Sequence, residues 1–213
     1  MVIIFYFFLS FIFPFLWVFY FYKKDKHPEP FLGLFFAFFL GIASAIISYF
    51  FQDLASDFLI DRFYRFLVFA FIEEFLKFFL IWLLIFPQKI FDEPVDAMIY
   101  MMFSALGFAF LENAFFVFRS VDFDIFLTLI FRFFGANLLH VLASSLIGYG
   151  YAFSIKTRRI LPFLISFFSG TLLHFIYNYL IISLLPGFIL VLPILWTTFL
   201  VVLNEVNYLI KNG

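Results

Sequence analysis

The stretch FLGLFFAFFLGIASAIISYFF, residues 31–51, contains no charged side chain and decides the fold class of this chain. A helix of about 20 apolar residues crosses a hydrocarbon core roughly 30 Å thick, because each residue adds about 1.5 Å along the helix axis. Similar runs recur along the 213 residues and are separated by short polar breaks. A single soluble core could not bury them all. The sequence therefore predicts an all-α fold, a polytopic bundle of transmembrane helices.

We expect about seven spans, at residues 2–22, 31–51, 66–86, 98–118, 127–154, 160–182 and 187–204. The fifth is long enough to tilt, or to begin with an interfacial turn around residues 131–135. The first run has no basic segment before it and no A-x-A cleavage site, which favours a retained span over a cleaved signal peptide. Residues 1–213 are then one integral membrane domain.

The composition excludes several classes of function. Hydrophobic residues make up 66% of the chain and charged residues 13%, which places it in lipid. The net charge of -1 offers no basic surface for nucleic acid. There is no cysteine, so disulfides, thiolate metal sites and a cysteine nucleophile are excluded. Most of the 43 Phe residues are interpreted as lipid-facing bulk.

The basic residues outside the spans predict the orientation of the chain in the membrane. Cytoplasmic loops carry an excess of Lys and Arg. With the N-terminus outside, the cytoplasmic side receives eight, namely Lys23, Lys24, Lys26, Lys89, Lys156, Arg158, Arg159 and Lys211. The outer side then receives three, namely Arg62, Arg65 and Arg119. This count favours an N-terminus outside and a C-terminus inside.

Polar residues within the spans are the candidates for function. A charged side chain near the centre of a span costs about 2.5 to 3.5 kcal/mol on insertion scales, so several together need a reason. The set comprises Glu73, Glu74, Lys77, Glu112, Asn113, Arg132, Asn137, His140, His174 and Asn178.

Four of these residues are expected to lie at one depth. If consecutive spans run antiparallel, Glu73 and Glu112 each lie about 9 to 11 Å from the same surface. The same reasoning places His140 and His174 near that level. Glu73 and Lys77 share a helix face, as do His174 and Asn178, because each pair is four residues apart. A purely structural role, in which these groups only lock helices together, stays open.

The chemistry of these groups matches the hydrolysis of a carbonyl compound. A carboxylate in apolar surroundings can act as a general base on water. A His and an Asn one turn apart can donate hydrogen bonds to a developing oxyanion, which is worth most in a dry site. Water would supply the nucleophile.

Five ordered motifs resemble those of the PrsW family, which is similar to the CAAX prenyl protease and bacteriocin-processing superfamily of intramembrane glutamic proteases. The resemblance covers roughly residues 66–182. The motifs are EEFLK at 73–77, FDEPVDA at 91–97, GFAFLEN at 107–113, His140 with Gly148 and Tyr149, and HFIYN at 174–178.

The resemblance implies roles for individual residues. Glu73 would activate water, with Glu74 and Lys77 shaping the site. His174 and Asn178 would stabilise the oxyanion, and His140 would be a further catalytic or positioning group. Phe108 and Asn113 would support them. Glu112 stands where the CAAX branch usually has His, which leaves its role open and argues against prenylated substrates.

The resemblance also implies an activity and a location. It implies cleavage of membrane-anchored proteins, such as anti-sigma-factor-like regulators, in the bacterial inner membrane and without a cofactor. A zinc or iron site made by Glu73, Glu112, His140 and His174 is an alternative, although these ligands lack the tight spacing of a dedicated zinc motif.

Two further alternatives come from other classes of function. A proton- or ion-coupled transporter also places Glu and His in the membrane. Here the polar groups gather at one depth, and no pair of spans reads as inverted repeats, which argues against transport. A catalytically inactive scaffold that binds a partner's transmembrane helix is the second alternative, and the presence of every motif residue argues against it.

Overall fold

The computed structural model is helical wherever it has regular structure. It describes residues 28–119, 125–183 and 187–212, together with residues 4, 5, 8, 12, 15, 16, 18–20, 22, 23 and 27. The helices are α2 (Phe31–Ser56), α3 (Arg62–Leu84), α4 (Pro94–Arg119), α5 (Ile125–Arg132), the π-helical η1 (Phe133–Asn137), α6 (Leu138–Thr157), α7 (Leu161–Ser183) and α8 (Gly187–Asn212). The described residues contain no strand, which confirms the all-α prediction.

Five helical segments of the described chain are long and apolar enough to cross a membrane. They are Phe31–Ser56, Pro94–Phe118, Leu129–Thr157, Leu161–Ser183 and Ile189–Lys211. The span expected at 66–86 forms α3, which carries Glu73, Glu74 and Lys77 at its centre. Because of these charges, α3 is not among the five segments that are apolar enough to cross a membrane. The span expected at 2–22 lies largely outside the described residues. The chain is therefore a polytopic, multi-pass helical membrane protein.

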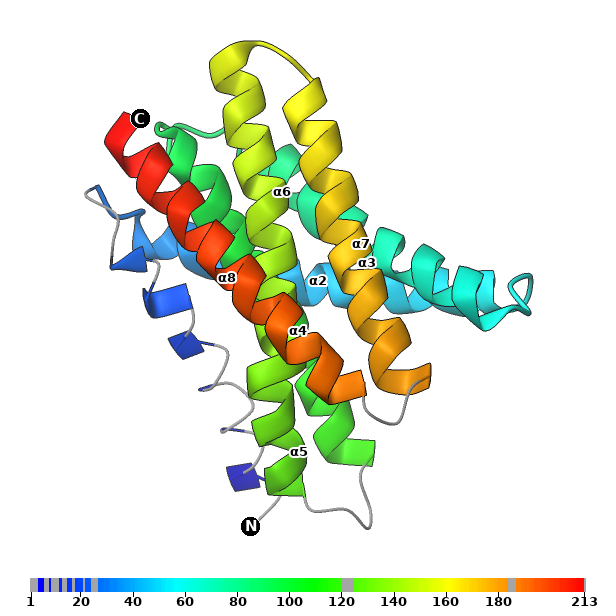
Figure 1. The fold of residues 1–213 in the computed structure, drawn as a ribbon. Helices are drawn as coiled ribbons and strands as arrows, with labels where there is room; N and C mark the ends of the chain where they lie inside the picture. The colour runs from blue at the N-terminus through cyan, green and yellow to red at the C-terminus, as the bar shows by residue number, and fades with distance from the viewer. Residues whose placement is uncertain are drawn as a thin grey trace.

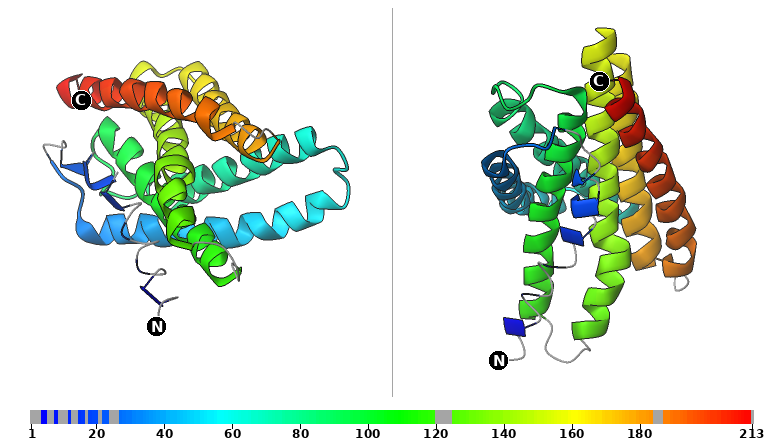
Figure 2. Two further views of the ribbon diagram at one scale, coloured as in Figure 1. Left: turned by 60° about the horizontal axis from the view of Figure 1, so that its bottom comes forward. Right: turned by 90° about the vertical axis from the view of Figure 1, so that its left-hand side faces the viewer.

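The helices run in two directions. α4, α6, α7 and α8 lie alongside one another, whereas the hairpin of α2 and α3 lies across them (Figures 1 and 2). The expectation that consecutive helices run antiparallel along one axis is thus wrong for α3 and α4. Because the α2–α3 hairpin crosses the bundle, the middle of α3 faces α6 and α7, and this crossing delivers its charged residues to the interior.

Glycines set the distance between the hairpin and the bundle. A Cβ on Gly41 of α2 would lie 1.9 Å from the carbonyl oxygen of Ser104 in α4. A Cβ on Gly107 of α4 would lie 1.9 Å from the carbonyl oxygen of Phe38 in α2. Small residues let helix backbones approach in this way in membranes. The two backbones are in direct contact, with no layer of side chains between them.

The N-terminus of α3 is fixed by the turn that follows α2. The Asp61 carboxylate accepts hydrogen bonds from the backbone N–H groups of Phe63 (2.8 Å) and Tyr64 (3.3 Å). Such N-caps satisfy the free donors of a first turn. Arg65 donates to the carbonyl oxygen of Leu59 through Nε (3.0 Å) and Nη2 (2.7 Å), which closes the turn. The register of α3, and hence the depth of Glu73, is set from this end.

A π-helical turn interrupts the longest helical run. η1 joins α5 to α6 without a break in the chain, at Phe133–Asn137. The interfacial turn expected at 131–135 is therefore a widened helical turn two residues further on. π-turns are rare and often occur at functional sites. This one lies between Arg132 and His140, both of which contact Glu112.

Phenylalanine side chains lie both on the outer surface of the bundle and in its interior. Phe31, Phe118 and Phe168 expose about two thirds of their surface, as expected of lipid-facing bulk. Others pack in the interior, where the ring of Phe86 stacks on Tyr151 with centroids 4.5 Å apart. Most of the hydrophobic residues between α4 and α6 are completely buried.

Candidate active site

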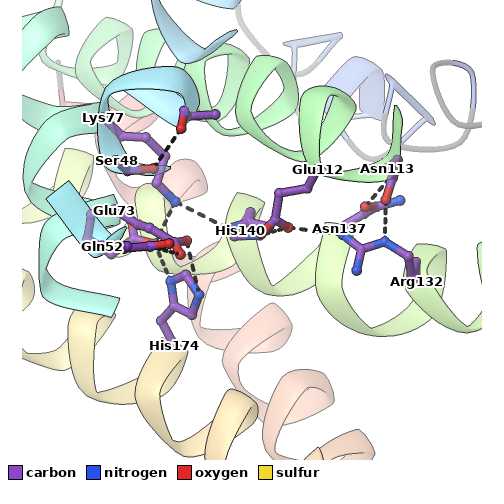
Figure 3. Close-up of polar contacts among 12 residues, drawn as sticks. Ser48, Gln52, Glu73, Lys77, Glu112, Asn113, Arg132, Asn137, His140 and His174 are labelled. Atoms are coloured by element: carbon purple, nitrogen blue, oxygen red, sulfur yellow. Dashed lines mark hydrogen bonds and ion pairs between the residues drawn. The ribbon is translucent and has the colours of Figure 1, made fainter. Parts of the chain in front are cut away.

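Charged and polar side chains of α3, α4, α6 and α7 meet in the interior of the bundle, with Gln52 of α2 beside them (Figure 3). The structure brings together six of the residues selected from the sequence. We call this set the active-site cluster, and it consists of Glu73, Glu74, Lys77, Glu112, His140 and His174. Glu73, Glu74, Lys77, His140 and His174 are all buried.

Glu73 has one oxygen held and one oxygen without a hydrogen bond. Gln52 of α2 donates from Nε2 to Glu73 Oε1 at 2.7 Å. Glu73 Oε2 is buried and has no hydrogen-bond partner, and it lies 3.4 Å from His174 Nε2. A buried, unpaired carboxylate oxygen is costly and calls for an explanation. Here it faces an imidazole nitrogen, the arrangement that a reacting water or a cation would use.

Glu74 is the most completely paired carboxylate of the cluster. Its Oε1 accepts hydrogen bonds from Lys77 Nζ at 2.6 Å and from His174 Nδ1 at 2.8 Å. Ser144 of α6 donates to its Oε2 at 3.2 Å. The side chains of Glu74 and Lys77 are both 0% exposed. A buried ion pair persists only when hydrogen bonds satisfy its remaining groups, and Glu74 meets that condition.

His140 links the two halves of the cluster. Lys77 Nζ lies 3.2 Å from His140 Nδ1, and because the ammonium can only donate, Nδ1 acts as the acceptor. His140 Nε2 then carries the proton and donates to Glu112 Oε2 at 2.9 Å. The rings of His140 and His174 meet edge to face with centroids 4.9 Å apart. The orientation of both imidazoles is therefore fixed by carboxylates.

A second cation closes the far side of the cluster. Arg132 Nη2 pairs with Glu112 Oε2 at 3.0 Å, and Arg132 Nε donates to Asn113 Oδ1. Asn113 Nδ2 in turn donates to Asn137 Oδ1 at 3.1 Å. Three carboxylates thus face two permanent cations and two imidazoles, so the chain itself supplies most of the balancing charge.

Two other residues selected from the sequence differ in how they relate to the cluster. Phe108 is buried, its ring lies 4.7 Å from Lys77 Nζ, and its centroid lies 5.1 Å from that of His140. It forms an apolar wall against the ammonium. Asn178 lies one turn beyond His174 on α7 and is half-buried, and in the described part of the chain it makes no polar contact with the cluster.

Gln52 is the functional candidate that the sequence analysis missed. The predicted span ends at residue 51, whereas α2 continues to Ser56 and keeps Gln52 in the helix. The signal was present as a polar stripe, because Ser44, Ser48 and Gln52 are spaced four residues apart in an otherwise apolar helix. The polar set selected from the sequence includes Arg132 and Asn137, but the sequence predicts no role for them in the site.

The donor set fits a metal ion of the zinc class. Glu73, His140 and His174 each offer an atom within 4.8 Å of the others. One nitrogen of each imidazole forms a hydrogen bond with a carboxylate, His140 with Glu112 and His174 with Glu74. Metal-binding histidines commonly make such a bond through the nitrogen that does not bind the metal. The nitrogens that remain are His140 Nδ1 and His174 Nε2. Lys77 Nζ lies beside His140 Nδ1, so its ammonium would compete with a bound cation.

The fold and the site together define the class of this protein. It is a multi-pass helical membrane protein with a site of carboxylate and histidine side chains inside its bundle. The model of the "PrsW family intramembrane metalloprotease" matches residues 29–204. The chain therefore belongs to the PrsW family, a family of intramembrane proteases.

Individual relatives agree with this assignment. The chain is 31% identical to "Protease PrsW" of Geobacillus kaustophilus over 175 residues, which cover 77% of this chain and 74% of the relative. It is also 31% identical to "Protease PrsW" of Oceanobacillus iheyensis over 172 residues, or 76% of each chain. Identity to "Protease PrsW" of Bacillus subtilis is 36% over 98 residues. No solved structure matches this chain.

Proposed function

We propose that this protein is an intramembrane endopeptidase that hydrolyses peptide bonds of membrane-associated proteins with a water molecule activated by Glu73. The observation that carries the proposal is the unpaired Oε2 of Glu73, which is buried and faces His174 Nε2 at 3.4 Å. A base held in place inside a dry site is the arrangement that general base catalysis requires.

The reaction balances with this chain's own residues. Glu73 takes a proton from water while the water oxygen bonds to the scissile carbonyl carbon, and the carbonyl electrons move onto oxygen. His174, protonated on both ring nitrogens, keeps Nδ1–H on Glu74 and donates a hydrogen bond from Nε2 to the resulting oxyanion. Asn178 donates a second hydrogen bond once a substrate draws it in. The C–N bond then breaks, and the leaving nitrogen takes the proton from Glu73. The products are a carboxyl group and an amine.

The remaining groups position these two. Gln52 holds Oε1 of Glu73, which leaves Oε2 for the water. Glu74 orients His174, and Lys77 balances the charge of Glu74. Glu112 orients His140 and is itself held by Arg132. Preorganised dipoles and charges of this kind act most strongly where water is excluded.

A metal-dependent variant of the same hydrolysis is the second candidate. The observation that favours it is the compact donor set of Glu73, His140 and His174. A bound zinc ion would polarise the carbonyl group and lower the pKa of water. In that case Glu74 and Glu112 would orient the two histidine ligands.

One experiment separates these candidates. Purified protein in lipid is incubated with single-span membrane proteins, comparing wild type, Glu73→Gln and His174→Ala with and without a strong chelator. We expect Glu73→Gln to lose at least about 10²-fold in rate, because it removes the base. Activity that survives the chelator supports the glutamic mechanism, and loss with the chelator supports the metal-dependent one.

Glu205→Gln is the matched control for this experiment. Glu205 lies in α8 and also has an unpaired, buried carboxylate oxygen, but it has no contact with the active-site cluster in the described structure. Its rate should stay within about twofold of wild type. Equal cleavage rates in wild type and correctly folded Glu73→Gln would overturn the proposal. Such a result would favour the transporter and scaffold alternatives instead.

We also propose that the substrates are membrane-anchored regulators of the anti-sigma-factor type, and that the chain lies in a bacterial inner membrane with its N-terminus outside. The distribution of Lys and Arg supports this orientation. The chain lacks cysteine, so single cysteines report topology cleanly. Arg62→Cys should react with an impermeant maleimide in intact cells, and Lys89→Cys only after lysis. The reverse pattern would invert the orientation.

A further inference from the structure

A second group of carboxylates lies far from the active-site cluster. Glu29 precedes α2, Asp92 precedes α4, and Asp96 belongs to the first turn of α4. Each offers an oxygen within 4.8 Å of the others, and we call these three residues the acidic cluster. Glu112 follows Asp96 by 16 residues, about 24 Å along α4. The two clusters therefore lie at different levels of the bundle.

The acidic cluster is buried and has an oxygen without a partner. Glu29 is 4% exposed and Asp96 is 0% exposed, whereas the side chain of Asp92 is exposed to solvent. Asp96 Oδ2 accepts hydrogen bonds from the backbone N–H groups of Asp92 (2.9 Å) and Glu93 (2.7 Å). Asp96 Oδ1 is buried and has no hydrogen-bond partner.

Neighbouring groups fix the cluster but do not balance its charge. The hydroxyl of Tyr100 donates to Glu29 Oε2 and also lies 3.2 Å from the carbonyl oxygen of Ile90. In the described parts of the chain, no Lys or Arg forms an ion pair with Glu29, Asp92 or Asp96. Buried charges are normally paired or bound to a metal. The described residues therefore leave the charge of the acidic cluster unbalanced.

A hollow beside the cluster leaves room for solvent. It has a volume of about 370 Å³, and its lining includes Glu29, Asp92 and Ile90. A cation held by two or three carboxylates could keep water molecules on this open side. The other side is closed by Tyr100, whose hydroxyl would lie 2.9 Å from a Cβ on Gly33.

We propose that Glu29, Asp92 and Asp96 bind a divalent cation of the hard, oxygen-preferring class, Ca²⁺ or Mg²⁺. All three donors are carboxylates, and Ca²⁺ and Mg²⁺ take oxygen ligands and retain water where the protein leaves space. The unpaired oxygen of Asp96 would become a ligand. The ion would join the segment before α2 to the start of α4.

A shared proton is the competing explanation. Burial, together with the neighbouring Asp96 carboxyl group, raises the pKa of Glu29 to about 9. A proton between Glu29 and Asp96 would remove one charge without a metal. The two explanations differ in whether Ca²⁺ or Mg²⁺ binds to the protein and in whether binding needs Asp92, which is not required for a proton shared by the other two.

The test is calorimetric titration of the purified protein in lipid nanodiscs with CaCl₂ and, separately, with MgCl₂. The titrations use Glu73→Gln protein as the background, so that the active-site donors contribute less. We expect one equivalent of one of the two ions to bind. Asp92→Asn should weaken binding at least about tenfold, because it removes a charged ligand. Asp92 is exposed, so this variant keeps the fold.

Glu93→Gln is the matched control, because it changes the same charge one residue away, outside the acidic cluster. It should bind the ion as the background does. Two results would overturn the proposal: no binding of either ion at millimolar concentration, or equal binding by Asp92→Asn and the background. The first would leave the shared proton as the explanation.

Discussion

The active-site cluster and the acidic cluster both bury carboxylates, but they balance the charge differently. In the active-site cluster, Lys77 and Arg132 contact Glu74 and Glu112 at 2.6 and 3.0 Å. In the acidic cluster, backbone N–H groups and the hydroxyl of Tyr100 are the donors. The active-site cluster carries its own cations, whereas no Lys or Arg of the described residues pairs with the acidic cluster, for which we propose a cation from solution.

This difference bears on what each site can do. Lys77 and Arg132 hold Glu74 and Glu112 in one geometry, which is preorganisation for a reaction. The one fully buried carboxylate oxygen of that cluster without a hydrogen bond belongs to Glu73, the proposed base. We expect the acidic cluster, which no Lys or Arg of the described residues pairs, to respond instead to the concentration of ions. The first suits catalysis, and the second suits linkage of two segments.

The largest expected effect on stability comes from removing the ammonium group of Lys77. Lys77→Met leaves Glu74 buried without its ammonium, so the free energy of unfolding should fall by about 3 to 5 kcal/mol. The double variant Glu74→Gln/Lys77→Met should recover much of this loss, because no uncompensated charge remains. Thermal unfolding in detergent measures both.

Lys156→Met is the control for the loss of a lysine. Lys156 is exposed near the end of α6, where its ammonium lies 5.8 Å from the ring of Tyr208. Its replacement should change the free energy of unfolding by less than about 0.5 kcal/mol. If Lys77→Met behaved like Lys156→Met, the contrast between the clusters would fail.

An intermediate effect is expected from Gln52. Gln52→Leu removes the hydrogen bond that holds Glu73 Oε1, so Glu73 can rotate away from its working position. We expect kcat to fall about tenfold with little change in KM. Ser48→Ala lies one turn earlier on the same face and loses only a bond to its own helix, so it should leave kcat unchanged. Equal kcat values for the two variants would exclude a positioning role.

The smallest expected effect is on the acidic cluster and comes from replacing Glu29. In chelator, Glu29→Gln should raise the free energy of unfolding by roughly 1 kcal/mol, because it removes one of two neighbouring buried carboxylates. Saturating CaCl₂ or MgCl₂ should reverse the order, since wild type gains the bound ion. Unfolding curves with and without the ion measure this. A variant less stable than wild type in chelator would show that the cluster balances its charge internally.

The sequence predicts the helical class well, because long apolar runs leave the backbone no alternative in lipid. It also identifies Glu73, Glu112, His140 and His174, since charges inside apolar runs are conspicuous. The crossing of the α2–α3 hairpin was not predictable, because it depends on the backbone contact at Gly41 and Gly107. That contact is a tertiary property, and nothing in the sequence distinguishes Gly41 and Gly107 from the other seven glycines of the chain.

Gln52 and the π-helical turn were missed for related reasons. The end of α2 was placed by hydropathy, which drops at Gln52, although the helix continues for four more residues. A π-turn adds one residue to a helical turn without any composition of its own. Whether His140 and His174 lie close enough to bind one metal ion was also not predictable from the sequence, because the two side chains meet only through the packing of α6 against α7.

The contact between Gly41 and Gly107 has a consequence for gating. Glu74 and Lys77 are completely buried, and His174 is 1% exposed, so a peptide bond reaches the site only when helices separate. α2 and α4 touch backbone to backbone, and neither can slide or rotate without carrying the other. We therefore expect that helices which separate to admit a substrate do so along an interface lined by side chains, with α2 and α4 moving together.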